Sequence, residues 1–165
     1  MYFDLAIVET GNGGDLQLIG NDLAVVNGIE NMPYLAMFGG GKYITPSNNT
    51  GLPQTAQSFD WWGNNLLMPS DQAAQFNSTV EEVLNTTPIN SAGRVIIQNA
   101  IIDDLQFLSP TAKIGVTVSI TAPDRIDVEI ILTQTVNKQQ TVVMSFKKAA
   151  TGDWVIFDFN NDFLL

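Results

Sequence analysis

The stretch 114–132, IGVTVSITAPDRIDVEIIL, contains two runs of alternating apolar and polar residues with a turn between them. Apolar residues occupy every second position from Ile114 to Ile120 and again from Ile126 to Leu132. Successive side chains of a strand point to opposite faces, so each run predicts a strand with one buried face. Because Pro and Asp favour turns, positions 123–124 are expected to join the two strands as an antiparallel pair.

The same pattern continues toward the C-terminus. A third strand is expected over 142–146 and a fourth over 154–157, after turns near 137–138 and 151–152. Strands joined by short turns predict an antiparallel meander with one face on a helical layer. Such a sheet has an edge that needs covering.

A main helix is predicted over 92–108, with Asn90 or Ser91 as its N-cap. Ser78 and Glu81 form a capping-box pattern that opens a helix over 79–86, and a short helical turn is expected over 71–76. The main helix should be the core element, through an apolar stripe of Ile97, Ala100, Ile101, Leu105 and Leu108, widened by Ile96, Ile102 and Phe107.

The N-terminal part predicts a strand over 2–9, then a hairpin over 15–25 that turns at Gly20-Asn21. A short helix follows from residue 29, with Pro33 in its first turn, and glycines 39–41 end it. The predicted class is α+β, in a single domain of residues 1–165.

Between residues 42 and 69 the periodicity is lost, and proline, glycine and asparagine are frequent. Loops of this length in a compact domain are uncommon and tend to be functional or disordered. This loop contains Trp61 and Trp62, followed by Gly63 and Asn64. Adjacent side chains in an extended segment point in opposite directions, so one ring can dock on the domain while a partner receives the other.

The C-terminal segment is unusually apolar. Residues 160–165 form a candidate arm, and the apolar side chains in and before it include Phe159, Phe163, Leu164 and Leu165. Such a segment packs either on its own sheet or on another subunit, and the sequence leaves both possibilities open.

The net charge of −10 is unevenly distributed, because residues 1–82 contain nine acidic residues and one basic residue. Phosphate backbones and anionic membranes need the opposite sign, so we expect neither nucleic acid nor membrane as a partner. Cysteine and histidine are absent, which removes thiolate sites, the usual general base and the commonest metal ligand. We expect no cofactor and no metal site.

Two pairs of adjacent acids, Glu81-Glu82 and Asp103-Asp104, are the remaining candidates for catalysis. Glycosidases place two carboxyl groups about 5–10 Å apart across a substrate. Neighbours on a helix point about 100° apart, so neither pair satisfies this geometry alone. No catalytic residue is therefore predicted.

The order of several short motifs resembles a known family. They are GDLQLIGNDLAVVNG at 14–28, a following helix that begins IENMPYLAMF at 29–38, and a loop that contains WWGN at 61–64. Together with the terminal meander they resemble the small baseplate wedge proteins of contractile phage tails, in the Mu-like branch often labelled lysozyme-like. The resemblance covers roughly residues 1–160 in the order of elements.

The resemblance implies a structural protein similar to the inner domain of the tail sheath subunit, which joins the wedge and initiates the sheath by strand addition. It implies a place in the virion baseplate, assembled in the host cytoplasm, with wedge and sheath proteins as partners and the hub or tube as a further candidate. Wedge contacts would come from Trp61, Trp62, Gly63 and Asn64. Sheath contacts would come from Trp154, Phe157, Phe159, Phe163, Leu164 and Leu165.

The chain departs from the family at two points. Mu-like relatives tend to have an aspartate after the Trp-Trp-Gly motif, where this chain has Asn64, and the Glu-Pro-Arg motif of the other branch is absent. Two other functions stay open at this point. One is a peptidoglycan hydrolase of the baseplate, as the family label suggests, and the other is a tube or terminator component of the tail.

Overall fold

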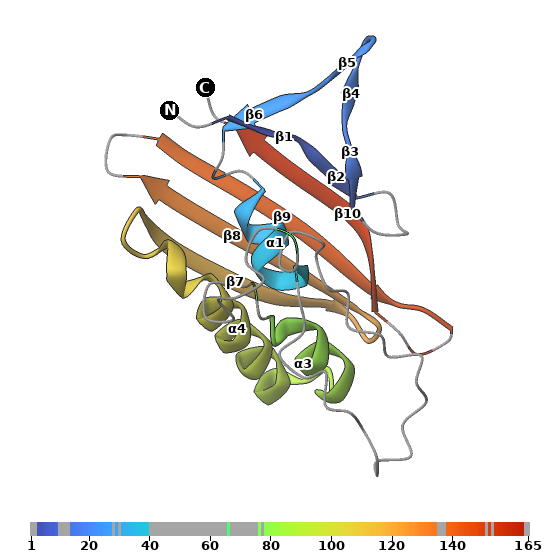
Figure 1. Ribbon diagram of the computed structural model, residues 1–165. Coiled ribbons are helices and arrows are strands. Elements are labelled where there is room, and N and C mark those ends of the chain that lie inside the picture. The colour runs from blue at the N-terminus through green and yellow to red at the C-terminus, as the bar shows by residue number, and fades with distance from the viewer. Residues whose placement is uncertain are drawn as a thin grey trace.

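The computed structural model describes residues 3–9, 14–27, 29, 31–39, 66, 76, 78–134, 138–150, 152 and 154–163. It is a mixed α+β structure in which a four-stranded antiparallel sheet carries helices and a group of short N-terminal strands (Figure 1). The short strands are β1 (Phe3–Leu5), β2 (Ile7–Glu9), β3 (Gly14–Leu16), β4 (Leu18–Ile19), β5 (Asp22–Leu23) and β6 (Val25–Asn27). The helical elements are α1 (Met32–Phe38), α3 (Val80–Thr86), α4 (Ser91–Leu105) and the 3-10 turn η1 (Gln106–Leu108). The long strands are β7 (Ala112–Ala122), β8 (Arg125–Gln134), β9 (Lys138–Lys148) and β10 (Trp154–Phe163).

The predicted meander is confirmed. The strands lie in the order β10-β9-β8-β7, and each is antiparallel to its neighbour. The fourth strand is longer than expected, because β10 pairs with β9 as far as Phe163 opposite Gln140. Residues 160–163 of the expected arm therefore belong to the sheet.

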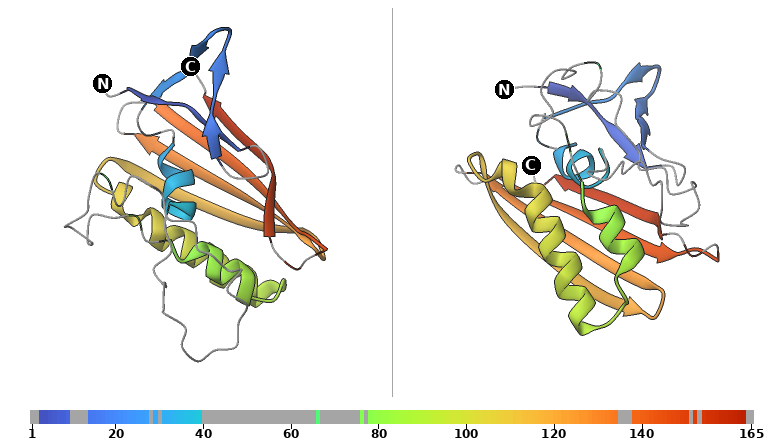
Figure 2. Two further views of the ribbon diagram at one scale, coloured as in Figure 1. Left: turned by 45° about the vertical axis from the view of Figure 1, so that its right-hand side comes forward. Right: turned by 60° about the horizontal axis from the view of Figure 1, so that its bottom comes forward.

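The helices α1, α3 and α4 lie on one face of the sheet (Figure 2). The alternation in β8 explains why, since Ile126, Val128, Ile130 and Leu132 are fully buried toward this layer. Ile97, Ile101 and Leu105 of α4 are equally buried and meet them. Apolar burial at about 25 cal/mol per Å² makes this layer the main source of stability.

The main helix begins as predicted, because Asn90 is its N-cap and the Asn90 side chain accepts a hydrogen bond from Gly93 N at 2.8 Å. The helix ends earlier than expected, and η1 replaces its last turn. The prediction that Ile96 and Phe107 widen the buried stripe is wrong, since about half of each side chain is exposed. Ile96 is rotated about 100° from the buried Ile97, and Phe107 packs edge-on against the Phe76 ring instead.

The capping box predicted at Ser78 is also wrong. The N-cap of α3 is Thr79, whose side chain makes no capping hydrogen bond. The cap comes from Asp104 on α4, whose carboxylate accepts the backbone N–H groups of Thr79 at 2.8 Å and Val80 at 3.1 Å. Asp104, which lies 25 positions from Thr79 in the sequence, thus provides the main cap. The Ser78 hydroxyl contacts Met37 O and Asp104 and takes part only by accepting from Val80 N at 3.2 Å.

The N-terminal prediction is only partly correct. The strand expected over 2–9 is broken at Ala6, and the hairpin expected over 15–25 is paired only at its tip, where β4 meets β5. Its outer arms separate, because β3 pairs with β2 and β6 pairs with β1. The turn at Gly20-Asn21 is confirmed, and Gly20 has the positive φ of 66° that favours glycine there.

Candidate interaction surfaces

The six short strands form three two-stranded ribbons that meet at one point, which we call the ribbon junction (residues 3–27; Figure 1). Ala6, Gln17 and Ala24 lie where the ribbons meet, and their backbones form a closed ring of hydrogen bonds. Ala6 N donates to Ala24 O, Ala24 N to Gln17 O, and Gln17 N to Ala6 O, each at 2.9 Å. This ring fixes the three ribbons relative to one another.

The ribbon junction is attached to the helical layer through Asn31, which precedes α1 and is buried. Its side-chain amide donates to Leu5 O at 2.6 Å and to Asp4 Oδ2 at 3.1 Å, and its Oδ1 accepts from Ile7 N at 3.2 Å. These contacts satisfy the backbone on both sides of the break at Ala6. Because a buried, unpaired polar group is costly, Asn31 supports both the break and the position of the junction.

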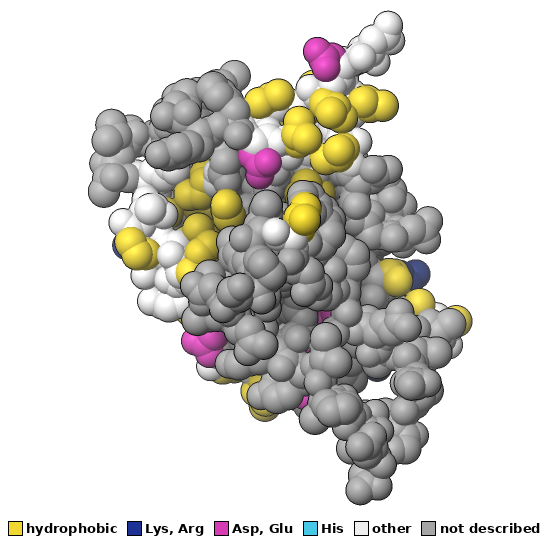
Figure 3. Space-filling model, viewed as in Figure 1, with side chains coloured by type: hydrophobic (Ala, Val, Ile, Leu, Met, Phe, Trp, Pro, Cys, Tyr) yellow, Lys and Arg dark blue, Asp and Glu magenta, His cyan; other side chains and the backbone are white. Residues whose placement is uncertain are grey.

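Each ribbon begins beside the junction with two apolar residues directly opposite each other. The pairs are Leu5–Val25, Ile7–Leu16 and Leu18–Leu23. Ile7 packs partly against the core, but Leu18 is 67% exposed, Ile19 is 68% exposed and Val25 is 60% exposed. Leu5, Leu16 and Leu23 are also exposed, and hydrophobic side chains gather over this end of the molecule (Figure 3). Contiguous exposed apolar surface of this kind marks interaction sites.

The second candidate surface is the edge strand β7. Val118 uses both of its backbone groups at the outer edge, where its C=O accepts from Arg94 Nη1 at 3.3 Å and its N–H faces Gln98 Oε1 at 3.5 Å. Backbone groups of a strand alternate in direction, so those of Ile114 and Val116 point the same way. Within the described part of the chain, no hydrogen bond reaches these outward groups of Ile114 and Val116.

A groove lies beside the open part of this edge. It runs between the end of α4 with η1 and the start of β7, and its lining includes Ile102, Gln106 and Ile114. The lining mixes apolar with polar side chains. Open backbone groups next to a groove are the features that an added strand uses, the first for pairing and the second for its side chains. The opposite edge of the sheet, β10, is contacted by β2 of the ribbon junction.

No family model, no curated protein and no solved structure matches this chain. The resemblance to baseplate wedge proteins therefore stays a prediction from the sequence motifs.

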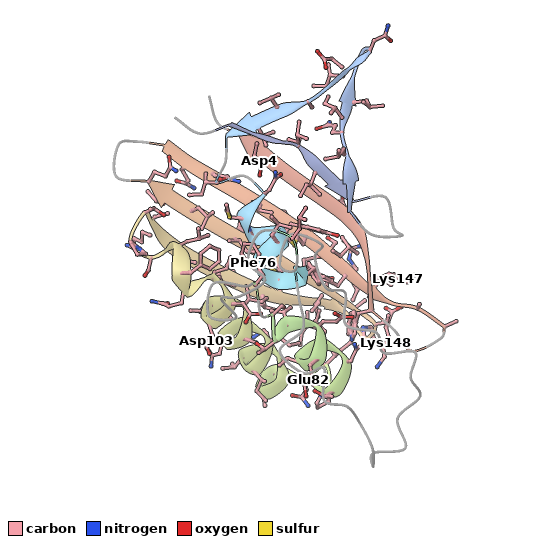
Figure 4. All side chains as sticks on the ribbon, in the orientation of Figure 1. Asp4, Phe76, Glu82, Asp103, Lys147 and Lys148 are labelled. Atoms are coloured by element: carbon pink, nitrogen blue, oxygen red, sulfur yellow. The ribbon has the colours of Figure 1, made fainter. Side chains whose placement is uncertain are left out.

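The acidic pairs have structural surroundings rather than a shared cleft. In each pair one carboxylate is more buried than the other, as Asp104 is relative to Asp103 and Glu81 relative to Glu82, and the exposed members lie on the outer sides of the helices (Figure 4). Burial raises the pKa of the Glu81 carboxyl. Burial also raises the pKa of Asp104, although hydrogen bonds from Thr79, Ser78 and Val80 partly lower it. The Asp104 carboxylate is thus occupied as the cap of α3.

The structure describes only some of the residues predicted to contact partners. Trp61, Trp62, Gly63, Asn64, Leu164 and Leu165 lie outside the described residues. Phe157, Phe159 and Phe163 belong to β10, and their side chains are also outside the description. Trp154 is half-buried and packs against the core. Among described residues, no helix is long and apolar enough to cross a membrane and no cluster of three metal-ligating side chains occurs.

The sequence prediction missed the apolar ribbon surface. The signal was present, because Leu16, Leu18, Leu23 and Val25 follow the period-two pattern of the expected hairpin. That pattern normally indicates a face covered by the rest of the domain. Here the ribbon of β4 and β5 projects beyond the sheet, although β2 contacts β10, and the residues of this pattern lie at the surface (Figure 1).

Proposed function

We propose that this chain is a structural, non-enzymatic subunit of a contractile phage tail baseplate, located in the virion, that joins the wedge and initiates the tail sheath. The observation that carries the proposal is the open half of the β7 edge, where no described residue makes a hydrogen bond to the outward backbone groups of Ile114 and Val116, and where Ile114 lines the groove. An incoming strand from a sheath subunit would pair there. The sequence motifs and the exposed ribbon surface support the assignment to an assembly subunit.

The expected strength of such a join is modest. Two residues exchanging N–H and C=O groups with a partner strand form at most four hydrogen bonds, each contributing about 0.5–1.5 kcal/mol net. The hydrogen bonds of Val118 with the Arg94 and Gln98 side chains limit how far pairing extends along β7. A strand held this way needs further contacts, which the groove would supply. The apolar residues of β10, at the opposite edge of the sheet, and the loop with Trp61 and Trp62 would make separate contacts with sheath and wedge.

The proposal is tested by removing one outward N–H without disturbing the sheet. Proline has no N–H, so Val116→Pro removes a donor that does not pair with β8. The matched control, Val116→Ala, shortens the same side chain but keeps the N–H. Tails assembled with the Ala variant should carry normal sheaths, whereas the Pro variant should give sheathless baseplates despite a folded subunit. Normal sheaths with the Pro variant would show that β7 does not accept the strand.

A further inference from the structure

The ribbon junction carries a second inference, independent of strand addition at β7. We infer that its exposed surface docks a protein partner whose contacting face has an apolar centre and a basic rim of Lys and Arg side chains. The central contacts would be made by Leu18, by Leu23 directly opposite it, and by Val25, which lies on the same face as Leu23, while Asp4 and Asp22 would attract the basic side chains.

These apolar side chains contribute little to the buried part of the junction. Among the junction residues whose burial is described, Ala6 and Ala24 are the buried ones, with the buried Asn31 beside them, whereas two-thirds of Leu18 and of Ile19 stays in water. Single exposed leucines are ordinary, but this surface combines two facing pairs, Leu5–Val25 and Leu18–Leu23. Their exposure has a use only when a partner covers them.

The ribbon junction is held in place by hydrogen bonds before any partner binds. The hydrogen-bond ring through Ala6, Gln17 and Ala24, together with the Asn31 contacts, holds the ribbons in one arrangement. A surface that is ordered before binding loses little conformational entropy on binding. Small two-stranded ribbons are otherwise marginal in water, so the ring and Asn31 make them a defined docking surface.

The negative charge of this part of the chain favours a basic partner. Residues 1–41 contain five acidic residues and no basic one. Asp4 and Asp22 are exposed on the ribbons, while Lys147 and Lys148 lie at the far end of β9 (Figure 4). A second copy presenting the same surface would bring acids against acids, and phosphate-bearing surfaces would be repelled in the same way. A partner face with basic side chains around an apolar centre is attracted both by the acidic residues and by the exposed apolar side chains of the junction.

The test uses two synthetic helical peptides as probes, one with leucines on one face and lysines around them, the other with glutamates in place of the lysines. Their binding to the isotope-labelled full chain is followed by the backbone amide signals. We expect the lysine peptide to shift signals of β4, β5 and β6, with an affinity that falls as salt rises. The glutamate peptide should bind at least tenfold more weakly.

Two double variants separate this surface from other exposed apolar residues. Leu18→Ser with Val25→Ser should weaken binding of the lysine peptide about tenfold or more, since central apolar contacts carry most of the energy of an interface. Val95→Ser with Ile96→Ser, on the exposed side of α4, should leave the affinity unchanged. Asp22→Asn keeps the oxygen that accepts from Leu23 N at 2.9 Å and should reduce the salt dependence.

Three results would overturn the inference. Equal binding of the two peptides would remove the role of charge, and this comparison needs only the wild-type chain. Shifts confined to other parts of the molecule would place the binding surface elsewhere. Concentration-dependent shifts of β4–β6 without any peptide would show that a second copy is the occupant.

Discussion

The hydrogen bonds by which Asp104 of α4 caps α3 offer the sharpest test of how these two helices pack together. Replacing Asp104 by alanine removes the acceptor for Thr79 N and Val80 N and for the hydroxyls of Ser78 and Thr79. Both hydroxyls can turn to other partners, and Val80 N also lies 3.2 Å from Ser78 Oγ. Thr79 N is the group left without a protein acceptor.

The expected loss follows from these contacts. Loss of a helix cap costs about 0.5–2 kcal/mol, and loss of a negative charge at a helix N-terminus costs about 0.3–1 kcal/mol. Relief of the burial of the carboxylate offsets part of this. Asp104→Ala should therefore lower the free energy of unfolding by about 2 kcal/mol, which corresponds to about 4–8 °C in Tm for a chain of this size.

The assay is urea unfolding at pH 7 followed by tryptophan fluorescence, with thermal melting as a second measurement. Asp103 is the matched control, because it is the neighbouring acid on α4 and is exposed. Asp103→Ala should change stability by less than about 0.5 kcal/mol. Asp104→Asn, which keeps one acceptor oxygen, should fall between the two. If Asp104→Ala is no more destabilising than Asp103→Ala, the cap has no energetic role.

Three further outcomes are expected. Asn31→Leu should lower stability by about 2–4 kcal/mol, because it removes the partner of the partly buried Leu5 C=O and Ile7 N–H groups, and it should speed amide exchange first in the ribbon junction. The control is Asn99→Leu at an exposed position, and equal losses of stability would contradict the anchoring role of Asn31. Arg94→Ala with Gln98→Ala should speed amide hydrogen exchange at Val118 but not at Thr117 or Ser119, which pair with β8. Unchanged exchange at Val118 would mean that these two side chains do not hold the edge of β7 there. The contributions of Asp104 and Asp127 to stability should change in opposite directions as pH falls. Each contribution is measured as the difference in unfolding free energy between wild type and the corresponding Asp→Asn variant. The folded-state pKa of Asp104 is raised by burial, so its contribution should grow as pH falls through that pKa toward the unfolded value near 3.8. Burial raises the pKa of Asp127, but hydrogen bonds from Ser145 and Arg125 outweigh burial and leave this pKa lowered overall. The contribution of Asp127 to stability should therefore be lost as pH falls below the ordinary value near 3.8. Equal changes of stability with pH for the two variants would contradict this assignment.

The parts of the fold that the sequence predicted are those set by local periodicity. Alternation from Ile126 to Leu132 depends only on the strand repeat, and Asn90 caps a helix that begins at the next residue. The meander and the start of α4 could therefore be predicted with no knowledge of tertiary contacts.

The parts that could not be predicted depend on residues distant in sequence. The break at Ala6 exists because β1 pairs with β6 while β2 pairs with β3, and the period-two pattern is identical for either partner. The cap of α3 comes from Asp104, and no local rule selects a residue on another helix. The exposure of Leu18 and Ile19 depends on the direction in which the ribbons leave the sheet.

The central claim is that this chain acts through its surfaces as an assembly subunit at the point where the sheath begins. Immunogold electron microscopy of intact tail particles, with an antibody against this protein, tests it most directly. Label confined to the junction of sheath and baseplate is the predicted result. Label elsewhere along the tail, or an absence of label from particles that react with antibody to a known tail protein, would contradict the claim.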